Sequence, residues 1–210
     1  MNSRLAIVAL AAFVAALSVR AEEAPAKPEK PKLAHGQMLK YGEKIVFSPC
    51  RDRSYIEFQD ASGDGSVLRG LDEVGLSQGK KLYVELLGIL DGNLLKAERI
   101  NLAKTEGHCQ LPGGRSEIWR AGGNEPGWVL AFGDEVVQVK RLGQADLVFP
   151  AAPLTLAPGA ASYGVAKDGH RLELRFEQQA CRDTMADMIT GWTASVTVDG
   201  QVLKGCAWQR

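Results

Sequence analysis

The sequence predicts a mainly β protein built from two small β domains, each stapled by a disulfide. Short β-prone runs alternate with turn-forming dipeptides along most of the chain. A Pro-Gly-Gly loop signal at residues 111–114 divides the chain near its middle. Two cysteines, Cys50 and Cys109, precede this loop. The other two, Cys181 and Cys206, follow it. The turns, the loop and the grouping of the cysteines together predict the fold class.

The composition is that of an ordinary globular protein, and the charge excludes one class of partner. Twenty-five Lys and Arg residues balance 25 Asp and Glu residues. Binding to nucleic acid or to an anionic membrane depends on clustered Lys and Arg. We therefore expect no nucleic-acid partner.

Residues 1–21 predict a cleaved signal peptide. A short basic start precedes an apolar run over 5–17, and a small-residue cleavage pattern ends at Ala21. A run of 13 residues is too short to cross a bilayer, which takes about 20 in a helix. The lipid-accepting cysteine of a bacterial lipoprotein is missing, since the first cysteine is Cys50. We expect a soluble periplasmic protein with no membrane anchor after cleavage.

Four cysteines in an exported chain favour two disulfides over thiol chemistry or zinc. Of the three possible connectivities, the grouping along the chain favours Cys50–Cys109 and Cys181–Cys206. The alternative is a pair of cysteines that cycles between the disulfide and the two thiols. The sequence lacks the CxxC spacing of such redox sites.

The first domain is predicted over 36–111, after a flexible tail of proline and charged residues at 22–35. About five strands are expected, with one helical turn at 72–76, and this composition suits a small closed barrel of the OB type. The clearest strand signals are at 44–47, 55–58, 81–88 and 94–102.

The second domain is predicted over 116–210, after a linker at 112–115. Its strand signals are at 128–132, 135–139, 146–150, 171–176, 193–198 and 201–206. The alternation in 171–176 predicts that Leu172, Leu174 and Phe176 share one buried face. Only 181–188 has a helical pattern.

Four segments of the second domain resemble a family of exported proteins and lipoproteins of Gram-negative bacteria, META/HslJ-like in style. The matching segments are 119–128, Tyr163 with 169–172, 181–185 and 203–206. The resemblance implies a META-like β domain and supplies no activity.

The first domain resembles the OB-type domain of the NlpE envelope lipoprotein family, in pattern more than in motif. The resemblance lies in 36–41, Cys50, 79–88 and Cys109. That family is linked to copper and to surface-stress signalling. This chain lacks the lipid-accepting cysteine and the CxxC of that family, so a role in stress sensing is expected only by analogy.

Five residues are predicted to form a binding site. Asn124, Glu125 and Trp128 belong to a Pro-Gly turn in which the tryptophan offers a large contact face. Asp183 and Met185 lie in the 181–188 insertion, which the predicted disulfide would pin at one end. The alternative is that these side chains close the end of the barrel and that Trp128 opens a strand into the core.

The function expected from the sequence is that of a non-catalytic binding or accessory protein of the cell envelope, with no cofactor. Its partner would be an envelope protein or a small molecule. The chain carries none of the motifs of hydrolases, phosphate loops or dinucleotide sites. The second hypothesis is a small-ligand or copper carrier using Trp128, Tyr163, His170 and Met185. The third is an envelope hydrolase with His170 as its base.

Overall fold

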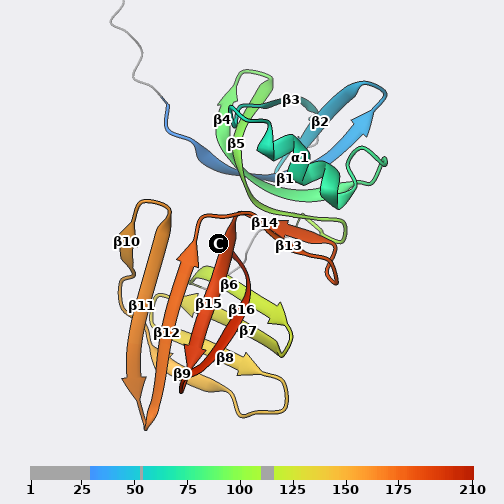
Figure 1. Cartoon of the computed structure of the whole chain (residues 1–210). Coiled ribbons are helices and arrows are strands. Elements are labelled where there is room, and N and C mark those ends of the chain that lie inside the picture. The colour runs from blue at the N-terminus through green and yellow to red at the C-terminus, as the bar shows by residue number, and fades with distance from the viewer. Residues whose placement is uncertain (1–28, 53, 110–115) are drawn as a thin grey trace, which may run out of the picture.

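The computed structural model describes residues 29–52, 54–109 and 116–210 (Figure 1). These residues form two β units that together contain sixteen strands and one helix. The first unit contains β1 (Lys32–Tyr41), β2 (Lys44–Pro49), β3 (Ile56–Asp60), α1 (Ser66–Val74), β4 (Leu82–Asp91) and β5 (Leu94–Lys104). The second contains β6 (Glu117–Asn124), β7 (Gly127–Gly133), β8 (Val136–Arg141), β9 (Leu147–Pro150), β10 (Thr155–Ala157), β11 (Ala160–Lys167), β12 (His170–Glu177), β15 (Trp192–Val198) and β16 (Gln201–Gln209). The short strands β13 (Cys181–Asp183) and β14 (Met188–Thr190) lie between β12 and β15 in the chain and join the sheet of the first unit.

The five strands of the first unit close into a barrel. Their order is β1-β2-β3-β5-β4, and β4 pairs back onto β1. Strands β3 and β5 run parallel, while the other neighbouring strands of the barrel are antiparallel. The helix lies between β3 and β4 in the chain. The prediction of an OB-like barrel with five strands and one short helix is confirmed.

Helix α1 begins earlier than the helical turn that the sequence predicted at 72–76. Its first turn is capped from the preceding segment of the chain. Asp60 Oδ2, at the end of β3, accepts a hydrogen bond from Leu68 N at 2.7 Å. The helix ends at Gly75, whose φ of 114° is in the left-handed region that glycine adopts at little cost. The turn signals were correct, but they mark the start of a helix.

Strand β1 begins inside the segment predicted to be a flexible tail. The structure places Lys32 and the three residues after it in register with β4, where His35 pairs with Glu85. The tail predicted over 22–35 is therefore wrong at its C-terminal end, while 22–28 lie outside the described residues. The pairing partner is about 50 residues further along the chain, so local composition did not reveal it.

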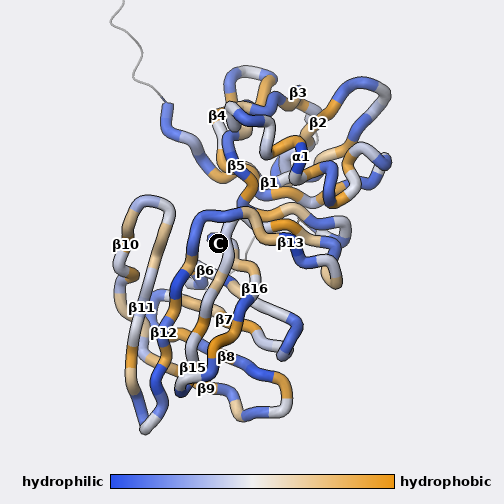
Figure 2. Tube along the Cα trace, in the orientation of Figure 1, coloured by the Kyte–Doolittle hydropathy of each residue, from blue (hydrophilic) through white to orange (hydrophobic). Residues whose placement is uncertain are grey.

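The strands of the second unit form a nine-stranded antiparallel sheet that curls into a half-barrel (Figure 1). Its order is β10-β11-β12-β15-β16-β6-β7-β8-β9. Hydrophobic and hydrophilic residues are interspersed along the strands (Figure 2), as in sheets with one buried face. Leu172, Leu174 and Phe176 are all buried in the core of this sheet, which confirms the predicted alternation.

The segment 181–188, predicted to be briefly helical, instead forms the β13–β14 hairpin. Strand β14 pairs with β5 of the first unit, with Ile189 opposite Ala103, and Ile189 is buried in the core of the barrel. The hairpin therefore lies among the strands of the second unit in sequence, between β12 and β15, but extends the first sheet. Strands of three residues are too short for their alternation to show, and their partner lies far away in the chain.

Both disulfides have the predicted connectivity. Cys50–Cys109 lies within the first unit. Cys181–Cys206 joins β13, in the first sheet, to β16, in the second. The second bond therefore links the two units as well as two parts of the C-terminal sequence.

Two predictions concern residues that the structure does not describe. The signal peptide at 1–21 and the linker at 112–115 both lie outside the described ranges and stay predictions. Within those ranges, no helix has the length and apolar character needed to span a membrane.

Candidate functional site

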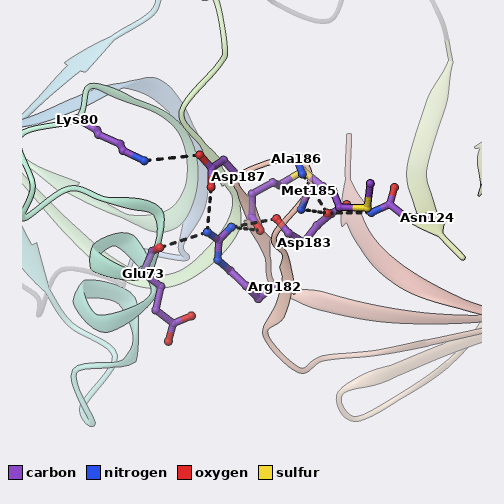
Figure 3. A network of polar contacts seen from close by, with 9 residues as sticks. Glu73, Lys80, Asn124, Arg182, Asp183, Met185, Ala186 and Asp187 are labelled. Atoms are coloured by element: carbon purple, nitrogen blue, oxygen red, sulfur yellow. Dashed lines mark hydrogen bonds and ion pairs between the residues drawn. The ribbon is translucent and has the colours of Figure 1, made fainter.

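The structure brings two of the predicted site residues into direct contact. Asn124, at the end of β6, donates from Nδ2 to Asp183 Oδ1 over 3.0 Å, although the residues are 59 positions apart. The same carboxylate oxygen accepts the backbone N–H groups of Met185 and Ala186, at 2.9 and 3.1 Å (Figure 3). Asp183 thus closes the turn of the β13–β14 hairpin and joins it to the second sheet.

Trp128 does not have the exposed contact face that the sequence predicted. It is 3% exposed and packs in the core of the half-barrel. Its Nε1 donates to the backbone oxygen of Lys204 at 3.2 Å. This position agrees with the alternative stated above, in which Trp128 opens a strand and packs into the core. Trp128 is still one of the residues that border the groove described below.

Glu125 and Met185 are exposed, as is Asn124. Glu125 lies in the two-residue turn between β6 and β7, where a cis peptide bond joins it to Pro126. Met185 lies on the turn of the hairpin and is 77% exposed. Both turns lie beside the contact between Asn124 and Asp183.

Arg182 fastens the hairpin to the first unit. Its Nη1 donates to the backbone oxygens of Asp183 and Met188, at 3.0 and 2.9 Å. Its Nη2 reaches the backbone oxygen of Glu73 in the last turn of α1, at 3.3 Å (Figure 3). A cation at the C-terminal end of a helix is favourable because the last carbonyl groups there carry partial negative charge.

One ion pair crosses the same contact, between Asp187 on the hairpin turn and Lys80 Nζ of the first unit, at 3.6 Å (Figure 3). Asp187 also lies 3.3 Å from Arg182 Nη2 within the hairpin. Sequence reasoning missed Arg182 and Lys80. The one local signal was that Arg182 follows Cys181, because the predicted disulfide fixes the position of the neighbouring backbone.

Two hollows flank the hairpin. The smaller, of about 350 Å³, lies over the Cys181–Cys206 disulfide and is bordered by Glu125 and Met185. The larger, of about 580 Å³, lies between the hairpin and strands β6, β7 and β8, and we call it the hairpin groove. Asn124 and Asp183 line both. The predicted residues therefore lie on the ridge between two hollows.

The hairpin groove has apolar walls and charged ends. Its apolar side chains are Val129, Leu142, Met188 and Trp208. Its charged side chains are Arg120, Lys140 and Asp183. Trp128 and Arg141 also border the groove, but they pair with each other across β7 and β8 and share the core face of the sheet. Two cations against one carboxylate give the lining a positive balance.

Both cations have carboxylate partners. Arg120 Nε donates to Glu117 Oε2 at 2.7 Å, and this hydrogen bond raises the pKa of Arg120. Lys140 Nζ lies 2.9 Å from Asp146 Oδ2. Arg141 lies on the other face of the sheet, since it pairs with the core residue Trp128, and its Nη1 donates to Gln201 Oε1 at 3.4 Å.

Glycines on the strands beside the groove allow close backbone approach. A Cβ on Gly123 would lie 2.4 Å from the Lys204 oxygen and 2.5 Å from Trp128 Nε1. A Cβ on Gly205 would lie 2.0 Å from the Gly122 oxygen. Side chains at these positions would push apart β6 and β16, which form the floor between the two hollows.

The residues proposed for a carrier are not brought together. His170 begins β12, at the opposite end of the half-barrel from the hairpin (Figure 1), and its Nδ1 lies 2.7 Å from Asp199 Oδ2. The backbone N–H of Arg171 and the His170 ring lower the pKa of Asp199. Tyr163 packs edge-on against Phe132. Among the described residues, no three His, Cys, Asp or Glu side chains gather as metal ligands.

A buried polar cluster where the two units meet was also missed. Glu85 is 1% exposed and accepts hydrogen bonds from Tyr83 Oη at 2.9 Å and from Asn101 Nδ2 at 2.8 Å. The Asn101 amide also makes two hydrogen bonds with the backbone of Gln209 at the end of β16. His35 Nδ1 lies 3.8 Å from the Glu85 carboxylate. A single glutamate inside an apolar strand was the signal that this sequence offered.

The resemblances described for the two domains rest on the sequence alone. No protein-family model, no curated protein and no solved structure matches this chain.

Proposed function

We propose that the protein is a non-catalytic binding protein of the cell envelope and that it captures a small molecule in the hairpin groove. The observation that carries this proposal is the groove itself. Its volume of about 580 Å³ falls within the range of roughly 300–1,000 Å³ typical of ligand sites. Its walls combine apolar side chains with a few polar groups, as such sites do.

The way in which the groove is held together supports a binding role. One wall is the sheet β6-β7-β8, and the other is a hairpin fixed by a disulfide, by Arg182 and by Asp183. A wall held in place before the ligand arrives loses little conformational entropy on binding. The groove is thus suited to capture without rearrangement.

The lining of the groove favours binding over catalysis. Its described lining contains no Ser, Thr, Cys, His, Tyr or Glu side chain. The lone carboxylate, Asp183, is occupied by Asn124 and by two backbone N–H groups. Chemistry of the nucleophile–base kind needs pairs of groups that this lining does not supply.

An envelope location is supported by the signal-peptide pattern at 1–21 and by the two disulfides. Disulfides persist in oxidising compartments, of which the bacterial periplasm is one. We therefore place the binding function in the periplasm. The connection to envelope stress rests on the NlpE resemblance.

Native mass spectrometry of protein purified from a periplasmic extract tests the proposal. We expect a bound mass that is lost on denaturation. Val129→Trp should fill the groove and abolish the bound mass, because Val129 lines it and is 52% exposed. The matched control is Val148→Trp on β9, where Val148 is 45% exposed outside the groove. Protein that never carries a bound mass, or equal retention by both variants, would overturn the proposal.

A further inference from the structure

We propose that the outer face of β12 is the contact surface of a transient dimer, in which two copies of this chain lie face to face with their β12 strands antiparallel. Four charged side chains that alternate in sign along the strand form this surface. We call it the charged ridge, and its members are Arg171, Glu173, Arg175 and Glu177. The inference goes beyond the proposed function, since the ridge lies outside the hairpin groove.

The four side chains of the charged ridge share one face of the strand. Leu172, Leu174 and Phe176 alternate with them and are buried in the core of the half-barrel. Because successive side chains of a strand point to opposite faces, the ridge lies on the outer face of the sheet. Its four side chains are between 50% and 75% exposed. The ridge is therefore open to a second molecule.

Small side chains lie on both sides of the charged ridge. The flanking residues that share its face in the register of the sheet are Ala160, Ser162, Gly164 and Ala166 on β11 and Thr193, Ser195 and Thr197 on β15. A hollow of about 470 Å³ lies over this part of the sheet. The long Arg and Glu side chains thus project beyond their neighbours, and the flanking strands leave room for the ridge of a partner.

The order of charges along the ridge is complementary to itself when the strand is reversed. A two-fold axis that passes between Glu173 and Arg175 would bring Glu173 of one copy to Arg175 of the other. The same axis would bring Arg171 of one copy to Glu177 of the other. All four contacts then join opposite charges, and the same patch serves both partners, as a two-fold interface requires. A parallel arrangement in register would instead bring like charges together.

The ridge keeps the capacity for these contacts although its members are paired within the strand. Arg171 Nε and Nη2 both contact Glu173 Oε1, and Arg175 Nε and Nη2 both contact Glu177 Oε1, at distances between 2.7 and 2.9 Å. Among the described residues, no contact of Oε2 of either glutamate is found. A carboxylate can accept a second guanidinium at that oxygen.

The alternation of charge favours a second copy over a partner of one sign. On a uniformly charged surface, every attracted group of the ridge would lie beside a repelled one. Two copies of this chain also have little long-range repulsion, because 25 basic residues balance 25 acidic ones. The ridge therefore fits its own reversed copy best.

The direction of β12 keeps the other parts of the two molecules apart. The strand runs toward the first unit (Figure 1), since its last residue, Glu177, is four positions before Cys181 in the first sheet. In an antiparallel pair, the two first units would lie at opposite ends of the contact.

The size of the contact predicts a weak dimer. Strand β12 has 8 residues, which at about 3.3 Å each give a strip about 26 Å long, and the two flanking strands make it about 10 Å wide. Stable complexes bury about 800 Å² on each partner. The ridge offers less, so we expect a dissociation constant above about 10 µM.

Sedimentation velocity of the full chain with both disulfides intact tests the proposal. We expect the average mass to rise toward that of a dimer as the protein concentration increases from about 1 to about 500 µM at low salt. The association should weaken at least tenfold between about 20 and about 500 mM salt, because salt screens exposed charges. A protein that stays monomeric throughout, or a dimer that is insensitive to salt, would overturn the proposal.

Charge reversal locates the contact. Glu173→Arg with Glu177→Arg makes the ridge wholly positive, and Arg171→Glu with Arg175→Glu makes it wholly negative. Each variant should associate with itself at least tenfold more weakly than the natural chain. An equimolar mixture of the two should form a mixed dimer at least as tight as the natural one, because all four contacts again join opposite charges. Recovery in the mixture also shows that both variants are folded.

The matched control changes the same net charge elsewhere. Glu43→Arg with Glu57→Arg replaces two exposed carboxylates of the first unit and should leave dimer formation within about twofold of the natural chain. If this control loses the dimer as fully as the ridge variants, or if the mixture of ridge variants fails to associate, the ridge is not the contact. Binding in the hairpin groove is measured separately by native mass spectrometry, so failure of the dimer is distinguishable from failure of the proposed function.

Discussion

The core of the half-barrel and the junction of the two units differ in what they bury. The core of the half-barrel consists of apolar side chains. The buried polar side chains among the described residues are Glu85, Asn101 and Thr190, and all three belong to the first sheet. On β4, Leu82, Val84 and Leu86 face the barrel core, and alternation puts Glu85 on the other face.

This difference shows how the molecule divides its stabilising interactions. Each core is held by apolar contacts that tolerate changes of shape. The junction of the two units is held by hydrogen bonds that require particular partners, such as Asn101 with Gln209. Buried hydrogen bonds contribute modestly when formed, but they cost much when one partner is lost. Substitutions at the junction should therefore lower the free energy of unfolding more than its small size suggests.

The largest expected effect distinguishes the two disulfides. Replacing both cysteines of a pair with alanine should cost about 4 kcal/mol for Cys50–Cys109 and about 3.5 kcal/mol for Cys181–Cys206 by the chain-entropy model. Their sequence separations are 59 and 25. Urea denaturation measures both losses. Amide exchange in the hairpin should rise only when Cys181–Cys206 is removed, and an equal rise in both variants would contradict its role at the junction.

The next effect tests the buried carboxylate. Glu85→Ala should lower the free energy of unfolding by about 3 kcal/mol, because the Tyr83 hydroxyl and the Asn101 amide each lose a buried partner. Glu173 on β12 is exposed and provides the matched control, where Glu173→Ala should cost less than about 0.5 kcal/mol. Similar losses in the two variants would remove the contrast between the junction and the half-barrel.

A smaller effect is expected at Arg182. Arg182→Met keeps the aliphatic stem but removes the hydrogen bonds to the hairpin and to Glu73, and should cost about 1–2 kcal/mol. Arg175→Met is the control, since Arg175 forms an exposed ion pair with Glu177 worth about 0–1 kcal/mol. Thermal unfolding compares the two. A melting temperature that drops as much for Arg175→Met would show that Arg182 is an ordinary surface contact.

The smallest effect concerns alkaline pH. Burial, and then the Glu85 carboxylate, raise the pKa of Tyr83. The folded chain therefore holds the phenol proton above pH 10, where the unfolded chain releases it, so the stabilisation is complete below about pH 10 and declines as the pH rises further. Tyr83→Phe should make the urea midpoint less dependent on pH between 9 and 11. The exposed Tyr55→Phe should leave that dependence as it is.

Local patterns predicted much of the fold. The alternation around Leu174 identified a buried face, and the strand signals at 81–88 and 94–102 correspond to β4 and β5. The grouping of the cysteines predicted both disulfides. These features depend on residues close together in the chain, or on a compartment in which cysteines oxidise.

The site was predicted in part, because its contacts are long-range. The contact between Asn124 and Asp183 joins residues chosen for the loops they were expected to occupy. Trp128 was placed wrongly because apolar residues occupy both faces of β7, so alternation could not assign its direction. The groove was missed, since only the curvature of the sheet and the docked hairpin create the hollow.

The pairing of β14 with β5 affects the order in which the molecule is completed. Protein synthesis starts at the N-terminus, so the end of β5 is made long before Met188, Ile189 and Thr190, which cover it. During that interval the edge near Leu102 has free backbone groups that pair readily with a strand of another chain. The first unit therefore finishes folding only when the second is nearly synthesised. Neither unit is expected to be stable when the other is deleted from the gene.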